Sequence, residues 1–412
     1  MSIEDLKETD PDIASIIFEE INRQQESLNM IASENLASKA VLVAQGSVLT
    51  NKYAEGYPDA RYYGGCFWVD RAEMIACERA GKLFAAEHVN VQPHSGTSAN
   101  LAVYYALLEP GDNILGMELN QGGHLTHGHS VNISGRYYRA FTYGVNKTTQ
   151  RLDLEQIRKI AKKTGPRLII AGASSYPRLI NFKGFKEIAE EVGAYLLVDM
   201  AHTAGFVAAQ LHPNPVPFAD AVTATTHKTL RGPRGGLILC KQKHASKIDK
   251  AIFPGLQGGP LMHTIAAKAV SFKEASLPGY KKYQQRVLEN ARALAEALME
   301  LNFDLVTGGT DTHQVLIDLR SKGVFGREAE TVLEKVNISV NKNTIPDDER
   351  SANDPSGIRL GTPTLTSRGM GPEQMKKVAS FIEQAIRERQ FAERLVLIKQ
   401  QVGDLCRDFP VY

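Results

Sequence analysis

The sequence lacks the features that mark several large classes of protein. Its 412 residues include only four cysteines, none in a CxxC pair, so a disulfide framework or a metal site is not expected and a reducing compartment is favoured. The 48 basic and 46 acidic residues leave a net charge of +2, which points to no dedicated nucleic-acid partner and no anionic membrane. No apolar run approaches the roughly 20 residues of a membrane span, and the acidic start resembles no secretory signal. We therefore expect a cytoplasmic protein.

What the chain does have is enough apolar material for two domains, since 43% of its 412 residues are hydrophobic. Between about residues 80 and 240, apolar runs alternate with the helical patterns LAVYYALLEPG and FKEIAEEVG, each ending in a glycine where a helix C-cap would stand. The apolar runs are HVNVQP, NILGME, RLIIAGAS, AYLLVDMAH, ADAVTATTHK and GGLILC. This alternation predicts an α/β fold with a mainly parallel sheet covered on both faces.

The pattern changes beyond about residue 280. The long helical pattern YQQRVLENARALAEALMEL is followed by the strand candidates HQVLIDL and NISVNK, and then by the helical patterns EQMKKVASFIEQAIRER and RLVLIKQQVGDLC. We predict an N-terminal helix and arm over residues 1–50, a large domain over 51–280 and a smaller C-terminal α+β domain over 281–412.

Four polar segments fall at the ends of strand candidates, where open α/β sheets place their ligands. The first is PHSGTSAN, residues 93–100, which opens a helical pattern. Ser95, Gly96 and Thr97 offer N–H groups and hydroxyls at a helix N-terminus, where the dipole and unpaired donors favour a phosphate. The competing interpretation is a simple helix N-cap, which alone would be the commoner one.

The second and third segments carry an acid and an amine. Asp199 ends an apolar run in LLVDMAH, and its partner is either a protonated pyridine nitrogen or an ordinary cation of the protein. His202, three residues on, contacts a ligand or satisfies a turn. Lys228 follows the strand candidate in TATTHKTLRGPRGG, where lost hydration would lower its pKa toward the neutral amine needed for a Schiff base. Its neighbours in this string are Thr225, His227 and Arg234, the last of which would help to balance a phosphate.

The fourth segment is SGIRLGTP, residues 356–363. Arg359 is suited to a bidentate pair with the carboxylate of an amino acid, and the competing interpretation is an exposed arginine beside a strand. Together the lysine, the aspartate, the phosphate cup and the arginine form a complete set for pyridoxal-phosphate chemistry on an amino acid.

Over essentially its whole length the chain resembles the serine hydroxymethyltransferase family. The strings that carry the resemblance are NMIASENLAS, TNKYAEGYP, RYYGGC, VQPHSG, GGHLTHG, VDMAHTAG, HPNPVPFAD, THKTLRGPRGGLILC, FPGLQGGPLMH, NKNTIP and SGIRLGTPTLTSRG. The resemblance implies a pyridoxal-phosphate-dependent transferase of fold type I, with a mainly parallel seven-stranded sheet. It also implies a homodimer or tetramer whose active sites are each shared by two subunits.

The same resemblance implies roles for individual residues. Lys228 would hold the cofactor as a Schiff base, with Asp199 on the pyridine nitrogen and His124 stacked on the ring. Further cofactor contacts would be Ser95, Gly96, Thr97, Ser174, His202, Thr225, His227, Arg234, Tyr53 and, from the neighbouring subunit, Gly259. Amino acid binding and proton transfer would involve Arg359, Ser33, Glu55 and, from the other subunit, Tyr53 and Tyr63. Tetrahydrofolate would contact Tyr62, Leu119, Gly123, Leu125 and Asn343.

The reaction implied is reversible transfer of the serine hydroxymethyl group to tetrahydrofolate, giving glycine and 5,10-methylenetetrahydrofolate. Phe67, Gln121 and His129 depart from residues common in the family and lie near strings expected around the cofactor or folate. Two alternatives therefore stay open. One is an aldolase or hydroxymethyltransferase acting on another β-hydroxy or α-methyl amino acid, against which the folate and proton-transfer positions argue. The other is a non-catalytic paralogue, against which the intact context of Lys228 argues.

Overall fold

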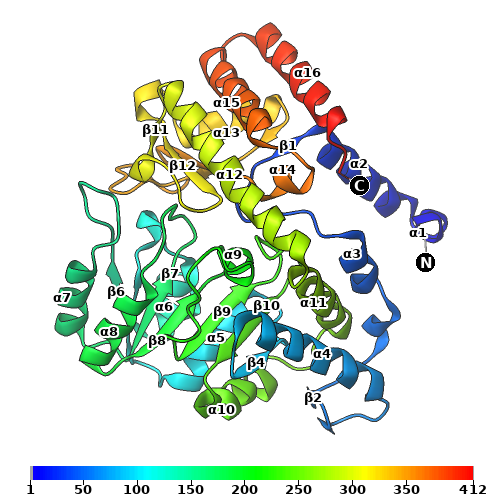
Figure 1. The fold of residues 1–412 in the computed structure, drawn as a ribbon, viewed down its shortest axis with the longest axis vertical. Coiled ribbons are helices and arrows are strands. Elements are labelled where there is room, and N and C mark those ends of the chain that lie inside the picture. Colours follow the sequence, from blue (N-terminus) through cyan, green and yellow to red (C-terminus); the bar gives the residue numbers. More distant parts are fainter. Residues whose placement is uncertain (1–2, 412) are drawn as a thin grey trace.

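The structure is a computed structural model that describes residues 3–411. Within that range, a seven-stranded mixed sheet lies at the centre of the larger of two lobes (Figure 1). Its strand order is β4-β10-β9-β8-β7-β5-β6. The five strands from β9 to β6 run parallel, while β10 is antiparallel to both of its neighbours. The strands are β4 (His88–Asn90), β5 (Asn113–Met117), β6 (Arg139–Tyr143), β7 (Leu168–Gly172), β8 (Tyr195–Asp199), β9 (Ala221–Thr225) and β10 (Gly236–Cys240). The predicted α/β class with a mainly parallel sheet is confirmed.

Burial explains which strands the sequence reveals. Every residue of β7, β9 and β10 is buried, because helices cover both faces of the sheet. Strands β7 and β10 read as continuous apolar runs, whereas β9 (AVTAT) includes Thr223 and Thr225. Strand β6, which the sequence pattern did not predict, is an edge strand with only its last residue buried. An edge strand pairs on one side only, so its sequence RAFTY needs no continuous apolar run.

Helices cover the two faces of this sheet with separate apolar cores. On one face lie α4 (Phe67–Phe84), α7 (Leu154–Thr164), α8 (Phe182–Val192), α9 (Ala204–Ala208) and α11 (Met262–Ala275). On the other lie α5 (Gly96–Leu107) and α10 (Ala245–Lys250), with α6 (Ile133–Tyr137) close to α5. The predicted glycine cap holds for α8, where Gly193 is left-handed. It is wrong for α5, which ends at Leu107 with Leu108 as its C-cap, so that Gly111 lies three residues further on, in the turn at Pro110-Gly111.

The smaller sheet is antiparallel, in the order β11-β12-β15-β14. Its strands are β11 (Asp304–Leu305), β12 (Gln314–Asp318), β14 (Asn341–Asn343) and β15 (Gly357–Gly361). The helices packed with it are α12 (Pro278–Glu300), α13 (Gly326–Lys335), α14 (Pro363–Ser367), α15 (Pro372–Arg387) and α16 (Ala392–Asp408). The predicted strand NISVNK is divided: β13 (Ile338–Ser339) leaves the sheet to pair with the N-terminal strand β1 (Leu28–Asn29).

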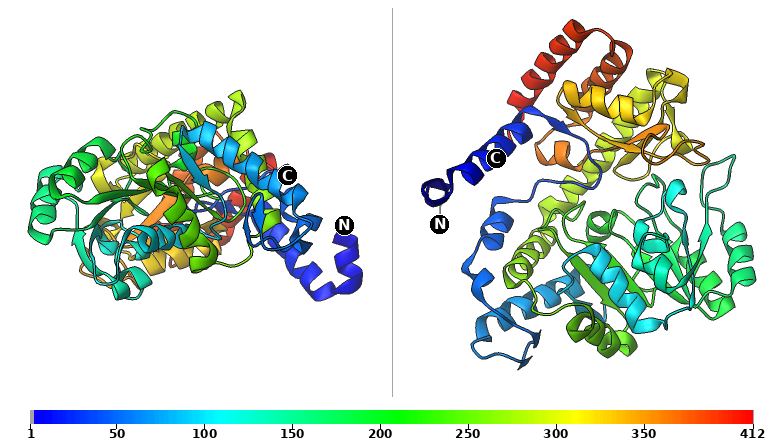
Figure 2. Two further views of the ribbon diagram at one scale, coloured as in Figure 1. Left: turned by 90° about the horizontal axis from the view of Figure 1, so that it is seen from below. Right: turned by 180° about the vertical axis from the view of Figure 1, so that it is seen from behind.

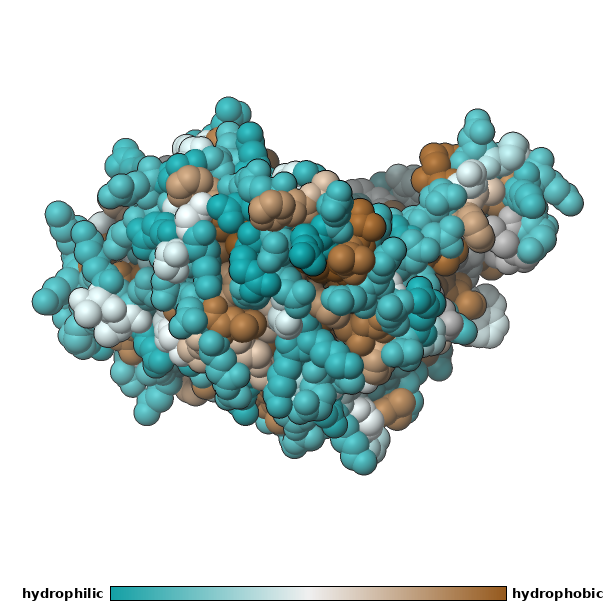
Figure 3. Space-filling view, turned by 90° about the horizontal axis from the view of Figure 1, so that it is seen from above, coloured by the Kyte–Doolittle hydropathy of each residue, from teal (hydrophilic) through white to brown (hydrophobic). Residues whose placement is uncertain are grey.

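The N-terminal segment links the two lobes. Helices α1 (Ile3–Thr9) and α2 (Pro11–Glu26) project beside α16, and α3 (Lys39–Gln45) lies against α11 (Figures 1 and 2). The projection formed by α1 and α2, at the right of Figure 3, carries apolar side chains among polar ones. Exposed apolar residues of α2 are Ile13, Ile16, Ile17, Phe18 and Ile21. The predicted domain limits stay a prediction; the helix α12 runs across the one at residue 280.

Across residues 3–411, no helix is long and apolar enough to cross a membrane. Within the same range, no cluster of three or more His, Cys, Asp or Glu side chains has an arrangement that could hold a metal ion.

Candidate active site

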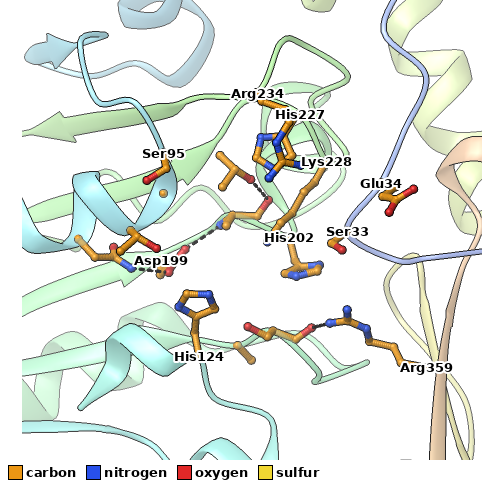
Figure 4. A pocket seen from close by; sticks show the side chains of 17 residues that line it. Ser33, Glu34, Ser95, His124, Asp199, His202, His227, Lys228, Arg234 and Arg359 are labelled. Carbon is orange, nitrogen blue, oxygen red and sulfur yellow. Dashed lines mark hydrogen bonds between the residues drawn. The ribbon is translucent and has the colours of Figure 1, made fainter. Parts of the chain in front are cut away.

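A cavity of about 390 Å³ lies where the carboxyl ends of β8 and β9 face strand β15 of the smaller sheet (Figure 4). This volume is within the usual range for small-molecule sites. Thirteen of the residues predicted from the sequence line it: Ser33, Ser95, Gly96, Thr97, His124, Ser174, Asp199, His202, Thr225, His227, Lys228, Arg234 and Arg359. The structure therefore gathers segments that are more than 300 positions apart, from residue 33 to residue 359.

One end of the cavity is the N-terminus of α5. Ser95 is its N-cap, and the Ser95 Oγ accepts a hydrogen bond of 3.1 Å from the backbone N–H of Ser98. The N-cap interpretation of this string is therefore confirmed, and the phosphate interpretation stays a prediction, for which the cap lines the cavity together with Gly96, Thr97 and Arg234. A Cβ on Gly96 would lie 2.7 Å from the Thr225 methyl carbon, so the backbone here has no room for a side chain. The unpaired N–H groups and Arg234 favour an anion.

Lys228 follows β9 by three residues and points into the cavity (Figure 4). Desolvation lowers the pKa of its amine to about 8, and the positive charges of Arg359 and Arg234 act in the same direction. The carboxylate of Asp199 opposes this shift. The backbone carbonyl of Lys228 accepts a hydrogen bond of 3.0 Å from Asn35 Nδ2, which fixes the loop. Lys228 thus has a substantial neutral fraction at mildly alkaline pH, as a nucleophilic amine requires.

Asp199, the last residue of β8, is held by several donors. Its Oδ2 accepts a hydrogen bond of 2.9 Å from Asn100 Nδ2 and lies 3.1 Å from His127 Nε2, while its Oδ1 accepts one of 3.0 Å from the Ala201 N–H. Burial would raise the pKa of this carboxyl, but the hydrogen bond and charge of His127, with smaller contributions from His124 and Asn100, hold it below its usual range. The cavity therefore contains a fixed negative charge.

Arg359 lies opposite, in the middle of β15. The prediction that its segment places it at the end of a strand is wrong; alternation along β15 directs the side chain into the cavity. Arg359 Nη1 donates a hydrogen bond of 2.7 Å to the Ser174 carbonyl, and Nε donates one of 3.1 Å to Asn341 Oδ1. Burial lowers its pKa to about 10, so the guanidinium stays charged at neutral pH. It can bind a carboxylate near Ser33.

The comparison with known families agrees with this geometry. The family model described as serine hydroxymethyltransferase matches residues 6–382 of the 412-residue chain. The chain belongs to the serine hydroxymethyltransferase family. Members of this family are pyridoxal-phosphate-dependent transferases of fold type I, and the seven-stranded, mostly parallel sheet fits that fold.

The cavity suits the family's cofactor. The N-terminus of α5 with Arg234 offers donors and positive charge to a phosphate, and Asp199 offers a fixed negative charge to a protonated pyridine. Burial lowers the pKa of His227 to about 3, and within residues 3–411 its Nδ1 is buried and has no hydrogen-bond partner. A buried nitrogen without a hydrogen-bond partner costs free energy, and a bound ligand that forms a hydrogen bond with it would remove that cost.

A second group of family positions lies outside this cavity. Tyr53, Glu55, Tyr63 and Gly259, here called the tyrosine–glutamate patch, do not belong to the cavity lining found within residues 3–411. They contact one another: Tyr53 Oη donates to Glu55 Oε1 over 3.3 Å, the two tyrosine rings are 5.1 Å apart, and Gly259 lies against the Tyr53 ring. Half of the surface of each tyrosine is exposed.

A buried arginine fixes the backbone of this patch. Arg61 is the last residue of the short hairpin of β2 (Gly56–Tyr57) and β3 (Ala60–Arg61), and it forms ion pairs with Asp70 and Glu73. Its Nη1 donates hydrogen bonds of 2.9 Å to the Ala54 carbonyl and 2.7 Å to the Gly56 carbonyl. Glu55 is therefore held on both sides while its carboxylate stays near the surface.

The five positions predicted to contact folate also lie outside the cavity lining. Tyr62 is exposed and packs edge-on against Phe253, with ring centroids 5.6 Å apart. Leu119, Gly123 and Leu125 belong to the turns around His124, and Asn343 ends β14. In the part of the chain that the structure describes, these five predicted folate contacts do not line the cavity. Of the five, Gly123 and Leu125 come nearest to it along the chain, as direct neighbours of His124.

The three departures from the family pattern have local roles. Gln121 Oε1 accepts a hydrogen bond of 2.8 Å from the Val145 N–H, and His129 Nδ1 accepts one of 3.3 Å from the Val131 N–H. Phe67 is exposed at the start of α4, where its ring packs edge-on against Trp68. Among the residues described, these three also stay out of the cavity lining.

Sequence reasoning missed several residues that shape the site. Asn100 and His127 bond to Asp199, Glu34 lines the cavity, and Gln314 contacts His202. Two of these had a usable signal. Asn100 stands four residues after Gly96, on the same helix face, and His127 stands three residues after His124. Gln314 had none, since it comes from the other sheet.

Proposed function

We propose that the protein catalyses the reversible transfer of the serine hydroxymethyl group to tetrahydrofolate, with glycine and 5,10-methylenetetrahydrofolate as products. The observation that carries this proposal is the single cavity that unites Lys228, Asp199, the N-terminus of α5 and Arg359. Each of the four suits one chemical group. In the order given, these groups are an aldehyde, a pyridine nitrogen, a phosphate and an amino acid carboxylate.

The cavity residues bind and orient. Ser95, Gly96, Thr97 and Arg234 would hold the phosphate of pyridoxal phosphate, and Asp199 would keep its pyridine nitrogen protonated. When bound, the cofactor supplies an electron sink for the electron pair of the broken Cα–Cβ bond. Arg359 would bind the serine carboxylate and so orient the Cα–Cβ bond of serine. The neutral amine of Lys228 would serve as the nucleophile.

Glu55 would move the proton. As the Cα–Cβ bond of serine breaks, the Glu55 carboxylate would accept the hydroxyl proton, and the one-carbon unit would leave at the oxidation level of formaldehyde. Glycine forms when Cα takes up a proton, so the proton that Glu55 accepts is balanced by the one that Cα gains. The tetrahydrofolate nitrogens take up this unit with loss of water. The nearby Tyr53 hydroxyl, whose pKa the charge of Glu55 raises, stays protonated and can donate to that carboxylate.

The position of the tyrosine–glutamate patch supports an oligomer. We propose a homodimer, with a tetramer as a further assembly, in which the patch of one subunit completes the cavity of the other. The exposed apolar residues of α2 would be covered in this assembly. Light scattering should give at least twice the chain mass of 45.3 kDa. A purely monomeric enzyme with full activity would contradict the shared site.

The test of the reaction is a spectrum of the cofactor-loaded protein with glycine. We expect a new visible band that tetrahydrofolate strengthens, together with tetrahydrofolate-dependent cleavage of serine. Indifference to folate combined with rapid cleavage of threonine-like substrates would instead indicate an aldolase. A protein without a borohydride-sensitive visible band would be a non-catalytic paralogue.

A further inference from the structure

A buried glutamine connects the small sheet to the cavity. Gln314, the first residue of β12, is 2% exposed. Its Nε2 donates a hydrogen bond of 3.0 Å to the Ser174 carbonyl and lies 2.7 Å from His202 Nδ1. Because a carbonyl only accepts, the atom facing Ser174 is the amide nitrogen, and this fixes the orientation of the whole amide. The second N–H of Gln314 therefore points at His202 Nδ1, which must act as an acceptor.

A neighbouring histidine leads to the same assignment. His313 Nε2 lies 3.1 Å from the Ala32 carbonyl, so this nitrogen carries a hydrogen. The same Nε2 lies 3.3 Å from His202 Nδ1. The two imidazole rings are nearly parallel, with an interplanar angle of 13° and centroids 5.5 Å apart. His202 Nδ1 thus faces an N–H of Gln314 and a His313 nitrogen whose hydrogen is donated to Ala32, so a hydrogen on Nδ1 would find an acceptor in neither.

The charge state of His202 agrees with this arrangement. Burial, followed by the positive charges of Lys228 and Arg359, lowers the pKa of His202 well below its ordinary value. The ring is therefore neutral and carries one hydrogen. Since Nδ1 is the acceptor, that hydrogen is on Nε2. Within residues 3–411 no hydrogen-bond partner of Nε2 is found, and the ring lies among Lys228, Ser33 and Arg359 (Figure 4).

We propose that Gln314 and His313 are positioning residues that hold His202 as the tautomer with its hydrogen on Nε2, so that His202 presents an N–H donor to the cavity. It then selects an oxygen acceptor, such as the ring oxygen of the cofactor or a carboxylate oxygen of the amino acid. This identification of the acceptor rests on the proposed function; the tautomer does not. Gln314 and Arg359 both donate hydrogen bonds to the Ser174 carbonyl. The smaller sheet therefore positions the N–H group of His202 and the guanidinium of Arg359 together.

The direct test is a neutron diffraction map of the full chain loaded with pyridoxal phosphate and exchanged into heavy water. We expect deuterium on His202 Nε2, none on His202 Nδ1, and deuterium on His313 Nε2. Deuterium on His202 Nδ1 would overturn the proposal. The map reads this hydrogen whether or not serine is a substrate, so failure of the proposed function and failure of this inference are distinguishable.

A variant tests the role of Gln314 in solution. Gln314→Glu replaces the donor by a carboxylate that only accepts, so His202 Nδ1 should become protonated. The measurement is the ring ¹⁵N shift of His202 in the loaded protein, assigned by its loss in His202→Asn. The matched control is Asn290→Leu, which removes another fully buried amide near the small sheet and should leave the shift unchanged. An unprotonated Nδ1 in folded Gln314→Glu would contradict the proposal. The wild-type map decides where the variant does not fold.

Discussion

The cavity and the tyrosine–glutamate patch differ in how they are built. The cavity of one chain gathers Lys228, Asp199 and Arg359 from both sheets, and each of the three has a pKa moved by its surroundings. The patch leaves Glu55 half-buried outside the cavity, beside tyrosines that are half exposed. A single chain therefore gathers most of the groups proposed to bind the cofactor and the amino acid, and leaves Glu55, the proposed proton-transfer group, outside its own cavity.

The two regions also differ in what holds their charged groups in place. The cavity is preorganised by buried strands and hydrogen-bonded donors, so its charges are fixed before a ligand arrives. The backbone of the patch is equally fixed, by Arg61, but its carboxylate gains a desolvated environment only when another surface covers it. Most of the predicted cofactor contacts therefore lie in one chain, whereas Tyr53, Gly259 and the proton-transfer group proposed at Glu55 would come from the second, so turnover should need two.

The largest expected effect is loss of turnover in Lys228→Ala. This change removes the nucleophilic amine, so serine cleavage should fall to background while the α5 N-terminus and Asp199 still hold pyridoxal phosphate noncovalently. Activity and cofactor content after gel filtration check both parts. Lys183→Ala, an exposed lysine on α8, is the control and should behave as the wild type. Full turnover of Lys228→Ala would refute the assignment.

Glu55→Gln should have the next largest effect. Removing the proton acceptor should lower the rate of serine cleavage by roughly 10²–10⁴-fold, the usual range for general acid–base catalysis. Glycine binding, measured by titration of the visible spectrum, should stay near the wild-type value because Arg359 is untouched. Glu187→Gln on the exposed face of α8 is the matched control. Unchanged cleavage would remove Glu55 from proton transfer.

Arg359→Lys should separate binding from chemistry. Lysine keeps the charge but loses the planar fork, and the lost charged hydrogen bond is worth about 1.5–3 kcal/mol, or roughly a ten- to hundredfold rise in the Kd of glycine. Cofactor binding should be retained. Arg327→Lys, at a surface arginine that bonds the Asn353 carbonyl, serves as the control. An unchanged Kd would show that the carboxylate binds elsewhere.

The smallest expected effect is a loss of stability in acid. Burial lowers the pKa of His124 to about 4 and the pKa values of His227 and His313 to about 3, against the ordinary value of 6.5 for histidine. The unfolded chain therefore binds protons that the folded chain does not, and stability that is present above pH 6.5 is lost as the pH falls toward 4. The thermal unfolding midpoint should drop by a few degrees over this interval, and less in His227→Asn. A midpoint that stays flat would contradict the buried neutral histidines.

Part of the fold could be predicted because strands that are buried on both faces consist mainly of apolar residues. Continuous apolar runs revealed β7 and β10. Strand β6 escaped because only its last residue is buried, so that RAFTY carries no apolar run, whereas the other edge strand, β4, was found through HVNVQP. The division of residues 337–342 between two sheets escaped for another reason. The partner of β13 is β1, more than 300 positions away, and no local pattern encodes that pairing.

The candidate site divides in the same way. The residues around Asp199 and Lys228 stand at strand ends, so local pattern and topology were enough to predict that they meet. Arg359 was expected at a strand end and lies in mid-strand, and Gln314 and His313 were not expected at all. Their positions depend on how the small sheet docks on the large one, which is a tertiary property.

The central claim is that cavity and patch belong to one active site formed by two subunits. The most direct measurement is the activity of mixed dimers of Lys228→Ala and Glu55→Gln, co-expressed with two different tags and purified through both. Each parent should be inactive, and each mixed dimer should contain one intact site of two, giving about half of the wild-type rate. Mixed dimers no more active than their parents would contradict the account, because Lys228 and Glu55 would then act within the same chain.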